Sequence, residues 1–450
     1  MSASILRTIA CRAVSACGIL VACSPMPSDV LPDTVEVRVV NPIAWPDGKL
    51  LIVSGGFVGR TDVPEVRLDT LRLAVARVDD STMSADLPDT SGSFALRLLY
   101  RGRQRVGSVT LVGFAGHTET IALTGWPHPE APGSPIVIAA TESSLVRLDL
   151  RTGAAANLGI GHSGSCAISP GPSYRDSVIV AQALAGTTCE SPMGWRVEPS
   201  AALVDSFALY PYPADRLWAE LAAGIWLRTA HHDLTIYTDG QVTLFEQLEE
   251  GERVILSPDR SRAVVLTTNA QNQVPMLLTA AGTVAFRLPL LSTEAVAFAP
   301  GGDTIFAAGY TAFTIGQPER LMAVSSATGA VLMQRDDALP QLWDLVLDPD
   351  APWVYGVGAE PADASGPYWQ PVILVFDRHT LQPLGRIRPP PTAACVSGLC
   401  GQVGMAIDAG ARRAYAFDVE GWGSSFFNTP TAIFSFELVP AAQPAEILTP

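Results

Sequence analysis

The chain has 450 residues, of which 48% are hydrophobic and only 16% are charged, and its formal net charge is −15. A chain this acidic lacks the basic face that nucleic acids and anionic lipid surfaces require, so neither is expected as an electrostatic partner. Its 38 glycines and 36 prolines favour many short strands and tight turns over helices. The composition predicts an all-β protein, and the length allows two or three domains.

The first 22 residues contain Arg7 and Arg12, no acid, and a short apolar run. This pattern is typical of a secretory signal and is too short to span a membrane, which takes about 20 apolar residues. The run ends in Leu-Val-Ala-Cys at residues 20–23, which resembles the lipobox of bacterial lipoproteins. The resemblance implies cleavage before Cys23 and acylation of its thiol, so that lipid chains anchor the protein to a membrane. The alternative is an ordinary signal peptide with a chance cysteine.

The residues after Cys23 refine this expectation. Ser24 stands where an aspartate would mark retention in the inner membrane, so the resemblance implies the outer membrane if the cell is Gram-negative. We therefore expect a signal peptide over 1–22 and a Ser- and Pro-rich tether over 23–33. The protein is expected to be exported and held on the cell envelope through the lipid at Cys23.

Four cysteines remain once Cys11 and Cys17 leave with the signal and Cys23 takes the lipid: Cys166, Cys189, Cys395 and Cys400. An even number of cysteines in an oxidising compartment predicts disulfides. Pairing 166 with 189 and 395 with 400 is the simplest of three connectivities. A zinc site is the alternative, but the sequence has no C-x-x-C and no suitably spaced histidine, so no metal site is predicted.

Residues 34–124 predict an immunoglobulin-like β-sandwich. Stretches such as "TVEVRVV" and "FALRLLY" alternate apolar and polar residues, which is typical of half-buried strands at short spacing. The order of features resembles IPT/TIG domains, with a compressed spacing in the first element. The positions that carry the resemblance are Gly48, Leu51, Val53, Gly55, Phe57, Ser81, Thr82, Leu87 and Pro88. Such domains are mostly spacers or adhesion modules, so the resemblance implies no catalysis.

A Pro-rich linker at 125–135 precedes a repeated phrase: an apolar strand, a Pro/Asp/Gly turn and a second apolar strand. Clear copies are "RVILSPDRSRAVVLTT", "AVAFAPGGDTIFAAG", "LVLDPDAPWVYGVG" and "MAIDAGARRAYAFD". Seven such turns recur at a mean spacing of about 46 residues, and four strands per such repeat is typical of a propeller blade. The phrases resemble YVTN and quinoprotein-like repeats, which implies a β-propeller over 136–450.

Seven copies predict seven blades, with six and eight as alternatives. Ring closure is expected from one of two segments, "AEILTP" at the end of the sequence or "TETIALT" before the linker. Closure of the ring removes the exposed strand edges that a single blade would leave.

Several residue patterns suggest chemistry, and each has a structural alternative. "GHSGS" places Ser165 where a nucleophile elbow needs its last glycine, so a loop beside Cys166 is favoured over a catalytic serine. His231 and His232 are adjacent, and adjacent strand residues point to opposite faces, so they are not expected to share a metal. The aspartates of the recurring turns are expected to cap those turns rather than act as acids or bases: Asp259, Asp303, Asp348, Asp350 and Asp408.

Three insertions near the end of the sequence combine aromatic residues with glycine and proline. Loops on a rigid scaffold often carry function, so these aromatic residues form a candidate recognition patch, with packing over blade edges as the alternative. They are Tyr368, Trp369, Trp422, Phe426 and Phe427.

We therefore expect a non-catalytic envelope lipoprotein whose propeller binds a protein or glycan, without a cofactor. The alternative is an extracytoplasmic enzyme, a lyase or hydrolase, with its site in the propeller funnel. That alternative requires His, Asp, Glu or Arg side chains from several blades to converge there, because propellers host many unrelated functions.

Overall fold

The computed structural model describes residues 36–450 with internal gaps. The gaps fall at 55–62, 80, 101–102, 124–126, 130–132, 142–143, 162–165, 173–177, 185–192, 198–202, 209–216, 231–232, 248–250, 268–274, 311–318, 340, 362–368, 389–401 and 420–430. Across the described residues every regular element is a β-strand, which confirms the all-β prediction. No helix in this part of the chain is long and apolar enough to cross a membrane.

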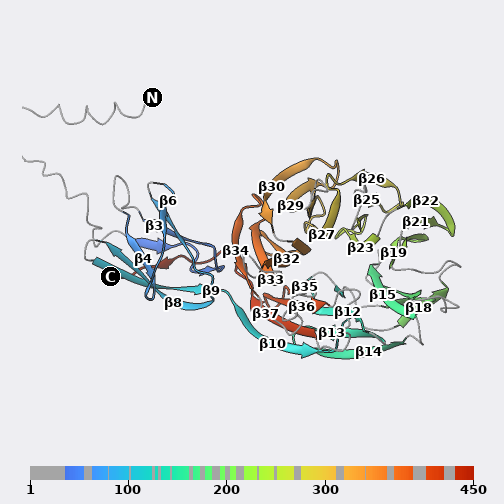
Figure 1. Ribbon diagram of the computed structural model, residues 1–450, viewed down its shortest axis with the longest axis horizontal. Helices are drawn as coiled ribbons and strands as arrows, with labels where there is room; N and C mark the ends of the chain where they lie inside the picture. Colours follow the sequence, from blue (N-terminus) through green and yellow to red (C-terminus); the bar gives the residue numbers. More distant parts are fainter. Residues whose placement is uncertain are drawn as a thin grey trace, which may run out of the picture.

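Two five-stranded sheets near the N-terminus face each other as a β-sandwich (Figure 1). One sheet has the order β38-β1-β3-β7-β6, with β1 (Val37–Val39), β3 (Lys49–Ser54), β6 (Val75–Arg77), β7 (Thr82–Asp86) and β38 (Glu446–Ile447). The other has the order β2-β9-β8-β4-β5, with β2 (Ile43–Ala44), β4 (Glu65–Leu68), β5 (Leu71–Arg72), β8 (Gly92–Tyr100) and β9 (Arg103–Leu111). Both sheets contribute to one apolar core, because alternate residues of β3, β8 and β9 point inward.

The remaining described strands form seven four-stranded sheets that follow one another around a ring, a propeller-like arrangement (Figure 1). The first sheet contains β11 (His128–Pro129), β12 (Ile136–Ala140), β13 (Ser144–Asp149) and β14 (Ala154–Gly161), and the second contains β15 (Cys166–Pro172), β16 (Val178–Leu184), β17 (Met193–Val197) and β18 (Leu203–Ala208). The third sheet contains β19 (Leu217–Ala222), β20 (Ile225–Ala230), β21 (Asp233–Thr238) and β22 (Gln241–Gln247). The fourth contains β23 (Gly251–Leu256), β24 (Arg262–Thr267), β25 (Met276–Thr279) and β26 (Val284–Arg287).

The other three complete the ring. The fifth sheet contains β27 (Ser292–Phe298), β28 (Thr304–Tyr310), β29 (Glu319–Ser325) and β30 (Val331–Leu339). The sixth contains β31 (Gln341–Leu347), β32 (Trp353–Pro361), β33 (Trp369–Asp377) and β34 (Pro383–Ile387). The seventh contains β35 (Gln402–Asp408), β36 (Arg413–Val419), β37 (Thr431–Glu437) and β10 (Phe114–Thr120). The first strand of each sheet lies toward the middle of the ring and the fourth toward its outside (Figure 1). Apolar clusters fill the space between neighbouring sheets.

The hairpins inside each sheet follow from turn residues in the sequence. Asp239 and Gly240 join β21 to β22, with φ of 50° and 78°. Two successive residues with positive φ give the type I′ geometry that matches the twist of a hairpin, and Asp-Gly is a favoured pair for it.

The strand pairing departs from the predicted domain limits of 34–124, 125–135 and 136–450. β10 lies in the range expected for the sandwich, but it pairs with β37 and completes the last sheet of the ring. β38 lies in the range expected for the ring, but it pairs with β1. β11 lies in the expected linker and pairs with β12. Of the two segments predicted to close the ring, the one before the linker does so through Thr118–Thr120, whereas "AEILTP" joins the sandwich.

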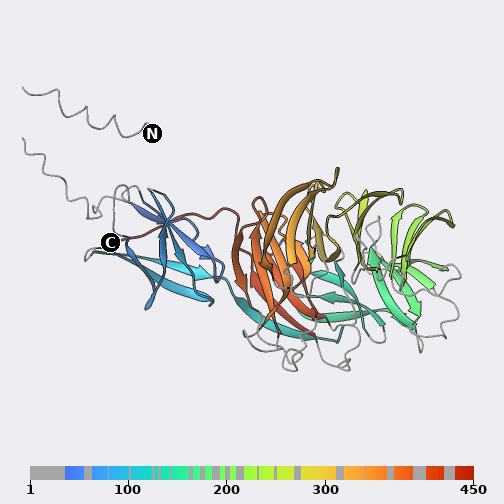
Figure 2. The same cartoon turned by 45° about the horizontal axis from the view of Figure 1, so that its top comes forward.

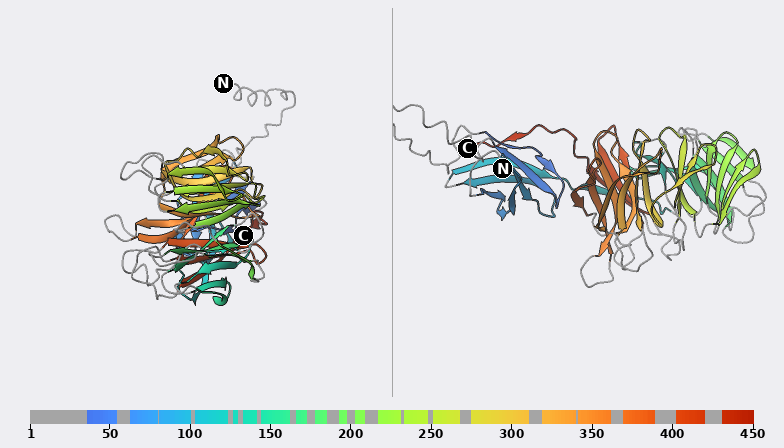
Figure 3. Two further views of the ribbon diagram at one scale, coloured as in Figure 1. Left: turned by 90° about the vertical axis from the view of Figure 1, so that its right-hand side faces the viewer. Right: turned by 90° about the horizontal axis from the view of Figure 1, so that it is seen from above.

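Trp45 joins the sandwich to the ring. Its side chain, 4% exposed, belongs to the apolar cluster between β31–β34 and β35–β37. The indole meets Tyr355 and Phe436 edge to face, with ring centroids 5.8 and 6.4 Å away. The backbone N–H of Arg386 donates to the carbonyl of Pro46 at 2.9 Å beside it. The sandwich therefore packs directly against the outer edge of the ring (Figure 3).

Charged side chains surround this apolar contact. Arg386 of β34 pairs with Asp47 at 2.5 Å and with Glu360 at 3.0 Å, and Arg388 pairs with Asp89. Because Asp47 and Asp89 belong to the sandwich and both arginines to the ring, these pairs also fix the relative orientation of the two parts.

Candidate functional site

Three successive inner strands share a bulge near their first residues. The ladder register shifts between Gly251 and Arg253 in β23, between Thr293 and Ala295 in β27, and between Leu342 and Asp344 in β31. A bulge bends the strand and re-aims the side chain next to it. Arg253, Ala295 and Asp344 therefore hold equivalent places on three neighbouring sheets.

Arg253 and Asp344 meet across the sheet that separates them. The guanidinium Nη2 donates to Asp344 Oδ1 at 2.9 Å, and Nη1 donates to the carbonyl of Trp343 at 3.4 Å. The residue at the equivalent place on the intervening β27 is Ala295, whose small side chain is compatible with this long-range contact. The backbone N–H of Leu345 also donates to Asp344 Oδ1 at 3.1 Å, and the backbone of Met405 in β35 adds a further hydrogen bond. Three sheets thus converge on one carboxylate.

Burial raises the pKa of the Asp344 carboxyl, and the Arg253 guanidinium together with the backbone donors opposes that rise. The side chain of Asp344 is 6% exposed and that of Arg253 18%. A carboxylate withdrawn from water needs such a partner, because an unpaired buried charge is costly. The pair is therefore a buried salt bridge that links the inner strands β23 and β31.

Three of the five turn aspartates, Asp259, Asp348 and Asp408, cap their turns as predicted, whereas the described contact of Asp350 is an ion pair with Arg412. Asp259 accepts hydrogen bonds from the Ser257 and Ser261 side chains at 2.6 and 2.7 Å, and these hold the pKa of its carboxyl below the usual value. Asp348 accepts from the backbone N–H of Asp350 at 3.0 Å, and Asp408 from that of Ala411 at 3.0 Å. These contacts cap the turns.

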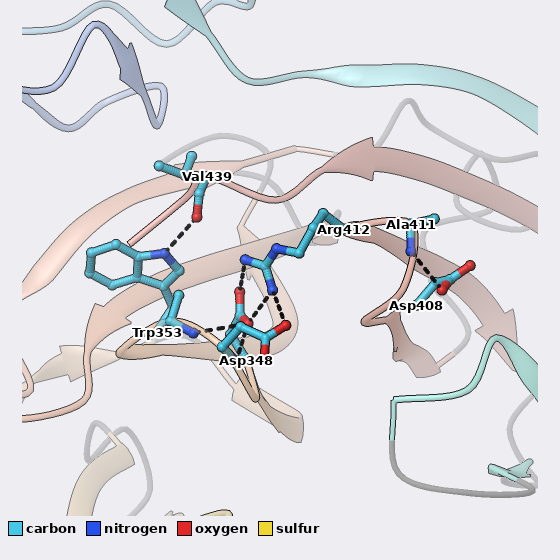
Figure 4. A network of polar contacts seen from close by, with 8 residues as sticks. Asp348, Trp353, Asp408, Ala411, Arg412 and Val439 are labelled. Atoms are coloured by element: carbon cyan, nitrogen blue, oxygen red, sulfur yellow. Dashed lines mark hydrogen bonds and ion pairs between the residues drawn. The ribbon is translucent and has the colours of Figure 1, made fainter. Parts of the chain in front are cut away.

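Asp348 also belongs to a polar network that reaches the next sheet (Figure 4). Its carboxylate is fully buried and accepts hydrogen bonds from both terminal nitrogens of the Arg412 guanidinium, at 2.7 and 2.8 Å. Arg412 lies in the turn of the next sheet and adopts a left-handed φ of 51°. Burial and the neighbouring Asp348 carboxylate raise the pKa of Tyr355, whose ring contacts Trp45. One polar network thus links two sheets to the joint with the sandwich.

Similar contacts join other neighbouring sheets. Arg196 of β17 pairs with Glu220 of β19 at 2.7 Å. Arg262, in the second strand of its sheet, donates to the Ser326 hydroxyl of the next sheet at 2.5 Å. Glu319 of β29 accepts from the backbone N–H of Leu342 in β31 at 2.9 Å. These polar side chains therefore connect neighbouring sheets of the ring.

Most residues predicted to carry function fall outside the described residues. These are Cys23, Ser165, Cys189, His231, His232, Tyr368, Cys395, Cys400, Trp422, Phe426 and Phe427. Cys166 begins β15 opposite Leu184, and Trp369 begins the third strand of its sheet opposite Pro361. The disulfides, the lipid site and the aromatic patch therefore remain predictions. Among the residues that are described, no group of three or more His, Cys, Asp or Glu is placed to hold a metal ion.

The Arg253–Asp344 pair is not among the sites predicted from the sequence, although the repeats contain a signal for it. In "RVILSPD" and "DLVLDPD" the two residues stand at the same distance before the turn. Opposite charges at one repeat position indicate a contact between repeats when that position faces the middle of a ring.

Comparison with known proteins adds little to this description. No protein-family model matches the sequence, and no curated protein matches it. Among solved structures, the chain is similar to one from "Crystal Structure of Mitotic Checkpoint Complex", with 12% identity and a TM-score of 0.49. The match covers 72% of this chain and 92% of that chain. A likeness at this level carries no argument about function, so the class of the protein rests on its own strand pairing: an all-β chain with a propeller-like ring.

Proposed function

We propose that the chain is an exported, lipid-anchored protein of the cell envelope whose ring is a non-catalytic binding module for a protein or glycan. In this proposal Cys23 carries the lipid, the sandwich is an IPT/TIG-like spacer, and the ring is a seven-bladed propeller. The outer membrane is the proposed location in a Gram-negative cell.

The observation that carries the proposal is the joint between sandwich and ring. Trp45 is buried in a cluster of ring residues, and Arg386 and Arg388 bind acidic residues of the sandwich around it. A joint of this kind holds the ring in one orientation relative to the sandwich, to which the tether is attached. Rigid display favours a binding module, because a preorganised surface loses less entropy when a partner binds.

The described polar groups of the ring support the same reading. The carboxylates of Asp344, Asp259 and Asp348 are engaged by groups of the protein itself. Recognition is therefore assigned to the segments that carry the candidate aromatic residues, among them Trp369 at the start of β33, Trp422 and Phe427.

Anchoring is tested by fractionating cells that express the native chain or Cys23→Ala. The native protein should enter the detergent phase, and Cys23→Ala should move to the aqueous phase, because the acyl chains supply the membrane affinity. If both proteins partition alike, the lipoprotein part of the proposal is wrong.

Binding is tested by mild cross-linking and detergent extraction, followed by mass spectrometry of the proteins and glycans that co-purify. Trp369→Ser with Trp422→Ser should remove a stoichiometric partner. Leu332→Ser is the matched control, because this side chain is 54% exposed on the outer strand β30. Equal recovery of the partner with both variants would contradict the aromatic patch, and recovery of none with the native chain would contradict the binding module.

One observation favours the alternative enzyme. A buried carboxyl with a raised pKa beside an arginine, where three sheets converge, is an arrangement that active sites also use. A lyase or hydrolase acting through this pair should lose activity toward envelope polysaccharides or peptides in Asp344→Asn, while the partner is retained.

A further inference from the structure

A short segment returns from the ring to the sandwich and completes it. After β37 the chain crosses the gap between the two parts and adds β38 to the edge of β1 (Figure 2 and Figure 3). The side chain of Gln443 already binds both backbone groups of Ile43, at 2.8 Å each, although the two residues are 400 positions apart. The sandwich is thus built from two distant pieces of chain.

Residues 446–449 extend one sheet at the edge of β1 and also reach the other sheet. Arg38 and Val39 of β1 pair with Ile447 and Glu446. On the other side, Thr449 exchanges two backbone hydrogen bonds with Val106 of β9, at 2.7 and 3.0 Å. The segment therefore closes an open side of the sandwich.

Side chains make this contact specific. Leu448 is fully buried in the sandwich core. The Glu446 carboxylate accepts from the Ser108 backbone N–H at 2.6 Å and from its hydroxyl at 3.0 Å. Gly107 leaves the room that both need, since a Cβ there would lie 2.4 Å from Leu448 Cδ2 and 2.9 Å from Glu446 Oε1.

We propose that β1 and β9 form a strand-acceptor site that recognises an extended Glu-x-Leu-Thr segment, and that residues 446–449 are its ligand. The ligand is a strand of this protein, supplied in the structure by the same copy. Backbone pairing supplies affinity and the alternate side chains supply specificity, as in other cases of strand addition. The inference does not depend on the proposed function.

The sandwich and the ring each receive one strand from the part of the chain that mainly forms the other. β10 leaves the sandwich side of the chain to complete the last sheet of the ring, and the 446–449 segment leaves the ring side to complete the sandwich. Release of the segment opens the sandwich without removing any strand of the ring. Opening at this site is therefore a local event in the sandwich.

The only lysine in the sequence, Lys49, gives a direct readout. It begins β3 opposite Asp86 of β7, and later residues of β3 pair with β1. A protease must draw out several extended residues around its cleavage site, so we expect a lysine-specific protease to cut there when β3 is released from its neighbours. In a chain lacking residues 440–450, cleavage should be faster by about tenfold or more, because proteolysis follows the population of the open form. A synthetic peptide of residues 440–450 should restore protection, and the same peptide with Leu448→Asp should not.

A full-length variant covers the case in which the shortened chain does not fold. Gly107→Val should displace the segment and raise cleavage at Lys49. Gly116→Val is its control, because no atom lies within 4 Å of a Cβ there. Unchanged cleavage in Gly107→Val, or failure of the native peptide to protect or bind the shortened chain, overturns the proposal. Dimers of the shortened chain mixed with a full-length copy would show that a second copy supplies the strand.

Discussion

The sandwich and the ring are both built from antiparallel sheets, but they are stabilised differently. In the sandwich, one apolar cluster collects residues from both sheets and from Leu448. In the ring, five clusters each lie between two neighbouring sheets, and the cluster containing Trp45 also reaches the sandwich. The ring thus resembles a repeat protein, in which each unit depends mainly on its neighbours.

This difference separates two kinds of response to mutation. A sandwich with one shared core loses its structure as a unit, and a strand from far along the chain matters as much as a local one. A ring of neighbouring contacts distributes the loss, so a change at one sheet boundary stays near it. Trp45 belongs to neither pattern, because it packs in a ring cluster from a sandwich position.

Removal of the joint should have the largest effect. Trp45→Ala empties a buried site between Tyr355 and Phe436 and should lower the free energy of unfolding by about 3–5 kcal/mol. Chemical denaturation should then resolve two transitions, one for each part, instead of a coupled one. Leu71→Ala, at a sandwich position that is 49% exposed, should leave the curve unchanged. A single transition with an unshifted midpoint in Trp45→Ala would mean that the two parts are not coupled through this residue.

A break at one sheet boundary should cost less. Arg412→Ala leaves the buried Asp348 carboxylate without its two charged donors and should cost about 2–3 kcal/mol. Arg413→Ala is the matched neighbour: its pair with Glu437 is 3.7 Å long and exposed, so its loss should cost less than about 0.5 kcal/mol.

Both variants lose one positive charge, but only Arg412→Ala leaves a buried carboxylate without its partner. Urea titration of both variants measures the difference in their free energies of unfolding. Equal losses in the two would contradict the role assigned to the buried pair. Hydrogen exchange should place the change in Arg412→Ala at the boundary between β31–β34 and β35–β37, with the sandwich core unaffected.

Much of the ring was predictable from local sequence. Each strand-turn-strand phrase, such as "RVILSPDRSRAVVLTT", forms the first two strands of a sheet, because alternating apolar residues and Pro/Asp/Gly turns act within about ten residues. The capping role of Asp259 and Asp408 followed from the same local chemistry.

The contacts that join distant segments were harder to predict. β10 is largely exposed and polar, so nothing in its pattern distinguishes an outer strand of the ring from a sandwich strand. The two residues of β38 are too few to show a period, and the contacts of Glu446 with Ser108 have no local signal. Trp45 looks like any core tryptophan until its partners are known. These choices are made by tertiary packing.

A pH titration compares the inner strands with the outer turns. Burial raises the pKa of Asp344, so the folded protein holds this proton more tightly than the unfolded chain. Its contribution to stability is therefore largest below the usual carboxyl pKa of about 3.9 and declines as the pH rises through the raised value. Hydrogen bonds from serine side chains lower the pKa of Asp259, so its contribution is present above the usual pKa and is lost as the pH falls.

The two asparagine variants should consequently diverge in opposite directions. Relative to the native chain, Asp344→Asn should become less destabilised as the pH rises from 4, because it lacks the group whose contribution declines. Asp259→Asn should become less destabilised as the pH falls below 4, because the native chain then loses its own contribution. Unfolding free energies measured between pH 3 and 7 decide the matter. If both variants followed the same pH trend, the Arg253 guanidinium and the backbone donors would outweigh burial at Asp344, and its pKa would not be raised.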